Sequence, residues 1–91
     1  MRDSKIPTIQ ATIGTSAIRI WIGQTLPIDF DLQNNGASAV YIGTDSGIAS
    51  NNGIKITSGG SFSSPASGWK EDIWLISDLS SDVRVLYKYR D

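Results

Sequence analysis

The sequence contains no cysteine, no histidine and only one glutamate in 91 residues. Without cysteine, the chain can form no disulfide and has no thiolate nucleophile. Without histidine, it lacks the usual general base of hydrolases, and most zinc sites need one or both of these residue types. We therefore expect a protein that is not an enzyme and that holds neither a metal nor a cofactor.

Strong charge and long apolar runs are also missing. Eight basic residues against nine acidic ones give a net charge of −1. Nucleic-acid-binding domains usually carry a basic stripe, so we expect no nucleic-acid partner. No apolar run approaches the roughly 18–20 residues of a membrane span. The first ten residues show no apolar segment typical of a secretion signal, so we expect synthesis in a cytosol.

What the sequence does have is isoleucine, which occurs 13 times against five leucines. β-Branched residues favour strands. The segment "PIDFDLQNNG" (residues 27–36) alternates strictly, with Ile28, Phe30 and Leu32 on one side and polar residues on the other. Alternation with a period of two predicts a half-buried strand.

The same pattern predicts strands elsewhere, with starts roughly 10–15 residues apart, which is typical of a sandwich or small barrel. The expected strands lie within residues 8–14, 16–23, 27–36, 39–43, 54–57, 73–77 and 83–89. We predict an all-β fold, a small antiparallel β-sandwich or barrel of six to eight strands. It forms a single domain over residues 9–91, preceded by an extended N-terminal arm of residues 1–8. The expected core comprises Ile18, Ile20, Ile22, Phe30, Leu32, Ile42, Leu75 and Val85.

Two groups of polar residues are candidates for a catalytic or a metal site. Asp29 and Asp31 share one strand face, but a glycosidase needs its carboxyls across a cleft, so we interpret them as a strand surface. The segment "GTDSGIASNNG" (residues 43–53) offers oxygen donors, among them Asp45 and Asn52. Calcium needs six to eight oxygens with several carboxylates, so turn formation explains this segment better.

Outward-facing aromatic residues are the best candidates for binding a partner. Alternation places Trp21 with Arg19 opposite the isoleucine face, and residues 58–68 form a loop with little structure of its own. Exposed aromatics and arginine are enriched in protein interfaces, and tryptophan also stacks on sugar rings. The candidate partner-binding residues are Arg19, Trp21, Tyr41, Phe62 and Trp69.

The order of motifs resembles small all-β structural proteins of tailed bacteriophages, including capsid decoration (cement) and head–tail accessory proteins. The resemblance covers residues 30–89. The matching positions are Asn35-Gly36, Val40-Tyr41-Ile42-Gly43, Gly53-Ile54, Gly59-Gly60-Ser61-Phe62, Ile73-Trp74-Leu75-Ile76 and Val83-Arg84-Val85-Leu86.

This resemblance implies a virion component, most specifically a capsid decoration protein made in the host cytoplasm. Its implied partners are further copies of itself, as a homo-oligomer and most specifically a trimer, and the major capsid protein or other virion proteins. A head–tail, tail accessory or fibre protein is one alternative. A carbohydrate-binding module that recognises the host through Trp21, Trp69 or Tyr41 is another.

Overall fold

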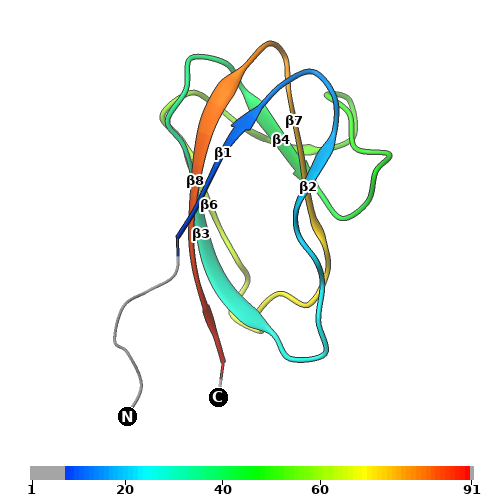
Figure 1. Ribbon diagram of the computed structural model, residues 1–91, viewed down its shortest axis with the longest axis vertical. Helices are drawn as coiled ribbons and strands as arrows, with labels where there is room; N and C mark the ends of the chain where they lie inside the picture. Colours follow the sequence, from blue (N-terminus) through cyan, green and yellow to red (C-terminus); the bar gives the residue numbers. More distant parts are fainter. Residues whose placement is uncertain (1–7, 91) are drawn as a thin grey trace.

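The computed structural model describes residues 8–90, which form eight β-strands and no helix (Figure 1). The prediction of an all-β fold with six to eight strands is confirmed. The strands are β1 (Thr8–Ile13), β2 (Ile18–Trp21), β3 (Ile28–Asn34), β4 (Val40–Gly43), β5 (Ile54–Ile56), β6 (Ser61–Ser63), β7 (Ile73–Ser77) and β8 (Ser81–Tyr89). The predicted arm lies outside the described residues, apart from Thr8, which is the first residue of β1.

The strands form two four-stranded sheets that face each other (Figure 1). One sheet has the order β1-β8-β3-β6 and is called here the β8 sheet; the other, the β7 sheet, has the order β2-β7-β4-β5. All neighbouring strands are antiparallel. This two-sheet arrangement of eight strands is that of a jelly roll, an architecture used by viral capsid proteins, lectins and cupins.

The core lies between the sheets and is made by alternate residues of both. In β3 the burial follows the predicted period, with Ile28, Phe30, Leu32 and Asn34 buried and the intervening residues more exposed. The buried hydrophobic cluster comprises Ile13, Ile28, Phe30, Leu32, Val40, Ile42, Ile56, Ile73, Leu75, Val83 and Val85. The predicted core positions on β3, β4, β7 and β8 are thereby confirmed.

The prediction for β2 is wrong for Ile18, Ile22 and Trp21. Ile18 and Ile22 are exposed, whereas the half-buried Ile20 packs against the core. The register against β7 shifts between Arg19 and Trp21, as in a β-bulge, so that Trp21 lies opposite the buried Ile73. A bulge reverses the alternation beyond it. Trp21 therefore packs against the core, although the sequence had placed it outward.

The segment 58–68 is also more ordered than predicted. Its residues 61–63 form β6, which pairs with β3 and places Phe62 opposite Leu32. Gly68 has a φ of +88°, a conformation that favours glycine, and the following Trp69 exchanges two backbone hydrogen bonds with Ile28. The chain is thus held against β3 at both ends of this segment.

A buried polar contact joins the two sheets. Asn34, which is fully buried at the end of β3, donates hydrogen bonds to the carbonyls of Ser38 and Ile56, the latter in the β7 sheet. Its carbonyl oxygen accepts from Gly36 N and from the hydroxyl of Ser81 at 2.5 Å. Because every polar atom of this side chain is satisfied, its burial is compatible with a stable core.

Candidate binding surface

The five residues predicted to bind a partner do not come together. Arg19 is exposed on the outer face of the β7 sheet, whereas Trp21 points inward from the same strand. Tyr41 is buried. Phe62 and Trp69 lie together elsewhere, packed around Phe30 of the β8 sheet. No single surface therefore contains all five.

Tyr41 lies on the face of β4 opposite the core residues Val40 and Ile42, but the prediction that it is exposed there is wrong. Its exposed fraction is 6%, and its hydroxyl donates a hydrogen bond to Asp78 Oδ2 at 3.1 Å. The end of the β4–β5 loop packs against it, because a Cβ atom on Gly53 would lie only 2.8 Å from Tyr41 Cβ. Burial raises the pKa of the Tyr41 phenol, and the hydrogen bond to Asp78 raises it further. Tyr41 thus contacts its own chain, at Gly53 and in the β7–β8 turn, and is not available to a partner.

Phe62 and Trp69 pack within the molecule instead of standing free on a flexible loop. The Trp69 ring meets the Phe30 ring edge-on at 5.4 Å and the Phe62 ring at 6.2 Å. Both side chains are half-buried. Aromatic pairs in this geometry add to the stability gained from burial. We therefore interpret Phe62 and Trp69 as residues that stabilise the packing of β3 and β6.

Several exposed apolar residues lie on β2 and in the segment that follows it. Ile18, Ile22 and Leu26 have exposed fractions of 37%, 61% and 62%, and Tyr89 at the end of β8 has one of 49%. Together with the half-buried Trp21, these residues are called here the β2 surface. A hollow of 420 Å³ is lined by Trp21, Ile22 and Tyr89 together with Arg19, Ile20 and Gln24. Exposed apolar residues that gather around a hollow are typical of interaction sites.

Three aromatic rings form the floor of the β2 surface. Trp21 packs against Tyr87 at 4.7 Å and Tyr89 at 5.9 Å between ring centroids, and the two tyrosines lie 6.2 Å apart. Such rings are rigid and offer a large contact area at little cost in side-chain entropy, which suits an interface. The sequence analysis missed this floor, because alternation placed Trp21 outward and nothing in the sequence puts it next to Tyr87 and Tyr89.

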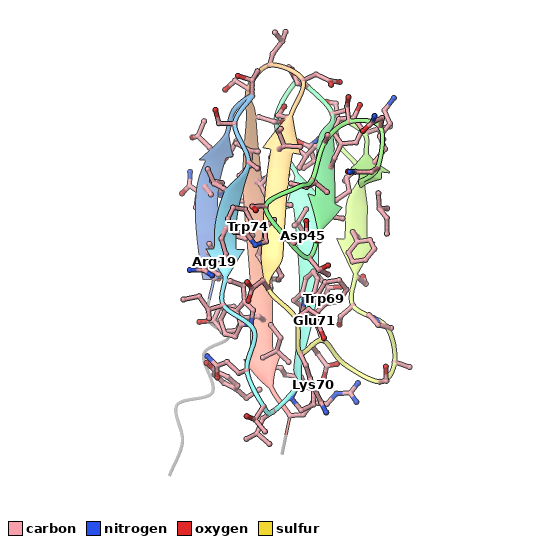
Figure 2. The ribbon with its side chains drawn as sticks, turned by 90° about the vertical axis from the view of Figure 1, so that its right-hand side faces the viewer. Arg19, Asp45, Trp69, Lys70, Glu71 and Trp74 are labelled. Atoms are coloured by element: carbon pink, nitrogen blue, oxygen red, sulfur yellow. The ribbon has the colours of Figure 1, made fainter. Side chains whose placement is uncertain are left out.

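Arg19 belongs to a second, polar cluster on the outer face of the β7 sheet (Figure 2). Its guanidinium lies 5.7 Å from the centre of the Trp74 ring, and its Nη1 lies 3.4 Å from Asp72 Oδ2. Asp72 also accepts a 2.6 Å hydrogen bond from Gly23 N. The Gly23 hydrogen bond lowers the pKa of Asp72, and Arg19 adds to this effect. The cluster fastens the end of β2 to β7.

A shallow polar hollow adjoins this cluster. Its volume is 520 Å³, and Figure 2 shows Lys70 and Glu71 on the same side of the molecule as Trp74. The lining residues are Gly23, Gln24, Thr25, Thr44, Lys70, Glu71 and Asp72. A half-exposed tryptophan near polar side chains is the kind of surface on which a sugar ring can stack.

Asp29 and Asp31 are not arranged as a catalytic pair. Asp29 makes a bidentate ion pair with Arg90, and Asp31 accepts a hydrogen bond from the hydroxyl of Ser63. The hydrogen bonds from Arg90 lower the pKa of Asp29. A general acid needs a raised pKa, so Asp29 does not suit that role.

The polar residues of the β4–β5 loop form a turn, as predicted. Asp45 Oδ1 accepts a hydrogen bond from Gly47 N at 2.8 Å, and Asn52 bonds with both Ala49 N and Gly47 O. Over residues 8–90, no group of three or more acidic, histidine or cysteine side chains is placed to hold a metal ion. In the same range there is no helix that is long and apolar enough to span a membrane.

Because of the Asp29–Arg90 ion pair, we expect the folded protein to lose stability in acid. Arg90 also donates a hydrogen bond to the Ala66 carbonyl, so the pair ties β3 and the end of β8 to the segment that follows β6. The pKa of Asp29 is lowered in the folded state. The ion pair therefore contributes fully to stability above the unfolded-state pKa of about 3.9, and this contribution is lost as the pH falls through the folded-state pKa.

The measurement is the melting temperature of the protein and of Asp29→Asn between pH 2 and 7. We expect the natural chain to melt higher near neutral pH, and the gap to close below about pH 4. Asp31→Asn is the matched control, because it removes a carboxylate from the same strand face whose described partner is a neutral hydroxyl. A gap for Asp29→Asn that stays constant down to pH 2 would contradict the assignment.

Comparison with known proteins gives a likeness of fold only. No protein-family model matches the sequence, and no curated protein matches it. Among solved structures, the chain is similar to a de novo designed double-stranded β-helix determined by solution NMR, with a TM-score of 0.57 and 13% identity. The match covers 90% of this chain and 99% of the designed one. At this identity the likeness shows the fold and carries no information about function.

Proposed function

We propose that the protein is a non-enzymatic structural protein of a bacteriophage virion, most specifically a capsid decoration protein. It acts as a homo-oligomer, most specifically a trimer, that binds the major capsid protein. The resemblance of residues 30–89 to small phage structural proteins supports this proposal. The jelly-roll architecture is compatible with it, because viral capsid proteins use the same arrangement. Since one fold serves many functions, the proposal depends on the binding surface.

The observation that carries the proposal is the β2 surface. Ile22 and Leu26 are each more than half exposed, and Ile22 lines the same hollow as Trp21 and the partly exposed Tyr89. A chain of 91 residues buries only about 60–65% of the surface of its unfolded form, so burial against a neighbour adds needed stability. Symmetric assembly requires a complementary patch and no catalytic cleft, which is what this surface offers.

The experiment is sedimentation of the purified protein with phage particles. We expect the chain to co-sediment with mature heads, and the double variant Ile22→Asp/Leu26→Asp to remain in the supernatant. Leu79→Asp is the matched control, because Leu79 is 73% exposed but lies in the turn between β7 and β8, outside the β2 surface. Equal binding by the double variant and the control would contradict the role of the β2 surface.

A tail or neck accessory role is the nearest alternative, and binding to tails but not to heads would establish it. The outer face of the β7 sheet favours a third possibility, a carbohydrate-binding host-recognition module. There Trp74, held by Asp72 and Arg19, lies near the polar hollow. Binding to a bacterial surface glycan that Trp74→Ala abolishes, without binding to any particle, would replace the decoration proposal.

A further inference from the structure

The last residues of β8 have a strand neighbour on one side only. β8 has nine residues, and all of those from Val83 to Tyr89 pair with β3. On its other side β8 pairs with β1, whose first described residue, Thr8, lies opposite Leu86. Figure 1 shows β8 continuing beyond the beginning of β1. Residues 87–89 therefore form an edge with no described neighbour on the β1 side.

Within residues 8–90, no strand pairs with the backbone groups on the β1 side of this edge. Asn35 N bonds to Asp82 O, and Arg90 N bonds to Pro27 O, so the even-numbered residues of β8 direct their backbone groups toward β3. In an antiparallel ladder, successive residues direct these groups to opposite sides. Tyr87 and Tyr89 consequently direct their N–H and C=O groups toward the open side. Unpaired groups of this kind are a template for an added strand.

The side chains beside this edge would cover an added strand on its inner face. Tyr87 and Tyr89 point toward the inside of the sandwich, where Trp21 contacts both rings. The exposed Ile22 adjoins the same hollow. An added strand would bury alternate side chains against these rings while its backbone pairs with β8. This is the geometry of strand addition, in which the backbone supplies affinity and the flanking side chains supply selectivity.

The protein's own N-terminal segment is poorly suited to complete this ladder in the same molecule. Thr8 lies opposite Leu86, so a continuation of this antiparallel register would place Pro7 opposite Tyr87. That position needs an N–H to bond with the Tyr87 carbonyl, and proline has none. A continuous extension of β1 would thus leave one acceptor of the edge unsatisfied.

We infer that residues 1–6 of a second copy of the chain add to β8 at Tyr87 and Tyr89, beside the β2 surface. Residues 1–7 precede Thr8 at the end of the sheet where the open edge lies, and six extended residues span about 20 Å, enough to reach an adjacent molecule. In the proposed trimer each copy gives its segment to the next, and this cyclic exchange joins the copies. The inference depends on the proposed self-association and names the segment that mediates it.

Disulfide trapping tests the inference cleanly, because the natural chain contains no cysteine. One protein carries Ser4→Cys, and a second carries Lys88→Cys at the exposed residue between the two tyrosines. After mixing and mild oxidation, we expect a covalent dimer of the two different variants on a non-reducing gel. The control partner is Thr12→Cys, an exposed residue paired with Asp82 at the other end of the sheet, which should give no dimer with Ser4→Cys.

The outcomes separate this inference from the proposal of self-association. A Ser4→Cys/Lys88→Cys double variant that forms its disulfide within one chain, with no dimer in the mixture, would show that the segment binds its own molecule. No disulfide at all in a protein that is still oligomeric would overturn the inference and leave self-association standing. A natural chain that is monomeric would overturn both.

A second variant probes the backbone pairing itself. Tyr89→Pro removes an N–H that faces the open side, so it should weaken self-association while leaving the ladder with β3 intact. Tyr89→Ala is its matched control, since it removes the same ring but keeps the N–H. We expect Tyr89→Pro to reduce the oligomer more than Tyr89→Ala at equal melting temperature. Equal effects of the two variants would contradict a backbone-paired strand at this edge.

Discussion

Replacing Phe30 with alanine should lower the free energy of unfolding by about 3–5 kcal/mol. Phe30 is almost completely buried at the centre of β3, and its ring contacts the rings of Phe62 and Trp69 at 5.9 Å and 5.4 Å. The substitution removes the buried ring and leaves a cavity that the two neighbouring aromatic rings cannot fill. Small domains have a total stability of about 5–15 kcal/mol, so a large part of it would be lost.

Equilibrium unfolding in urea measures this effect, with all proteins at the same concentration because self-association adds to apparent stability. Ile54→Ala is the matched control, since Ile54 is an exposed apolar residue at the end of β5. We expect the control to change the free energy of unfolding by less than about 1 kcal/mol. A loss below about 1 kcal/mol for Phe30→Ala would show that this aromatic cluster is not part of a packed core.

The double substitution Ile22→Asp/Leu26→Asp should abolish self-association without unfolding the domain. Both side chains are more than 60% exposed, so their replacement costs the monomer little. In an oligomer joined through the β2 surface, two carboxylates would be removed from water without partners, which is strongly unfavourable. A penalty of about 3 kcal/mol or more corresponds to a dissociation constant at least about 100-fold weaker.

Sedimentation velocity over a range of concentrations measures this change, and thermal melting confirms that the variant is folded. Leu79→Asp serves again as the control, because it introduces one such carboxylate at an exposed leucine in the β7–β8 turn. The account expects the control to keep the oligomeric state of the natural chain. If the control dissociates as fully as the double variant, the effect comes from added charge and not from the β2 surface.

The sequence alone predicted the fold class and most of the core, because long strands with one buried face alternate strictly. Phe30 and Leu32 on β3 show this well, since both neighbours of that strand keep it in register. The period of two was misleading in β2, a four-residue edge strand whose register shifts between Arg19 and Trp21. No composition rule locates such a shift, because it depends on the pairing with β7.

The candidate site was less predictable for a related reason. Exposure of Tyr41 depends on whether a loop folds over its sheet face, and the contact of Ile48 with Gly43 and Gly53 is a tertiary feature. Likewise, the sequence shows that Tyr87 and Tyr89 share a strand face but not that Trp21 lies against them. Among residues 8–90, the edge of β8 at residues 87–89 has no neighbour on the β1 side, which only the strand pairing reveals.

Light scattering of the natural chain after size-exclusion chromatography tests the central claim, self-association, most directly. The proposal predicts a molar mass three times the 9.8 kDa of one chain at micromolar concentration, decreasing only on strong dilution. A molar mass of two, four or more chains would show that the oligomer is not a trimer but would still support self-association. A mass of 9.8 kDa at every concentration up to several hundred micromolar would contradict the account.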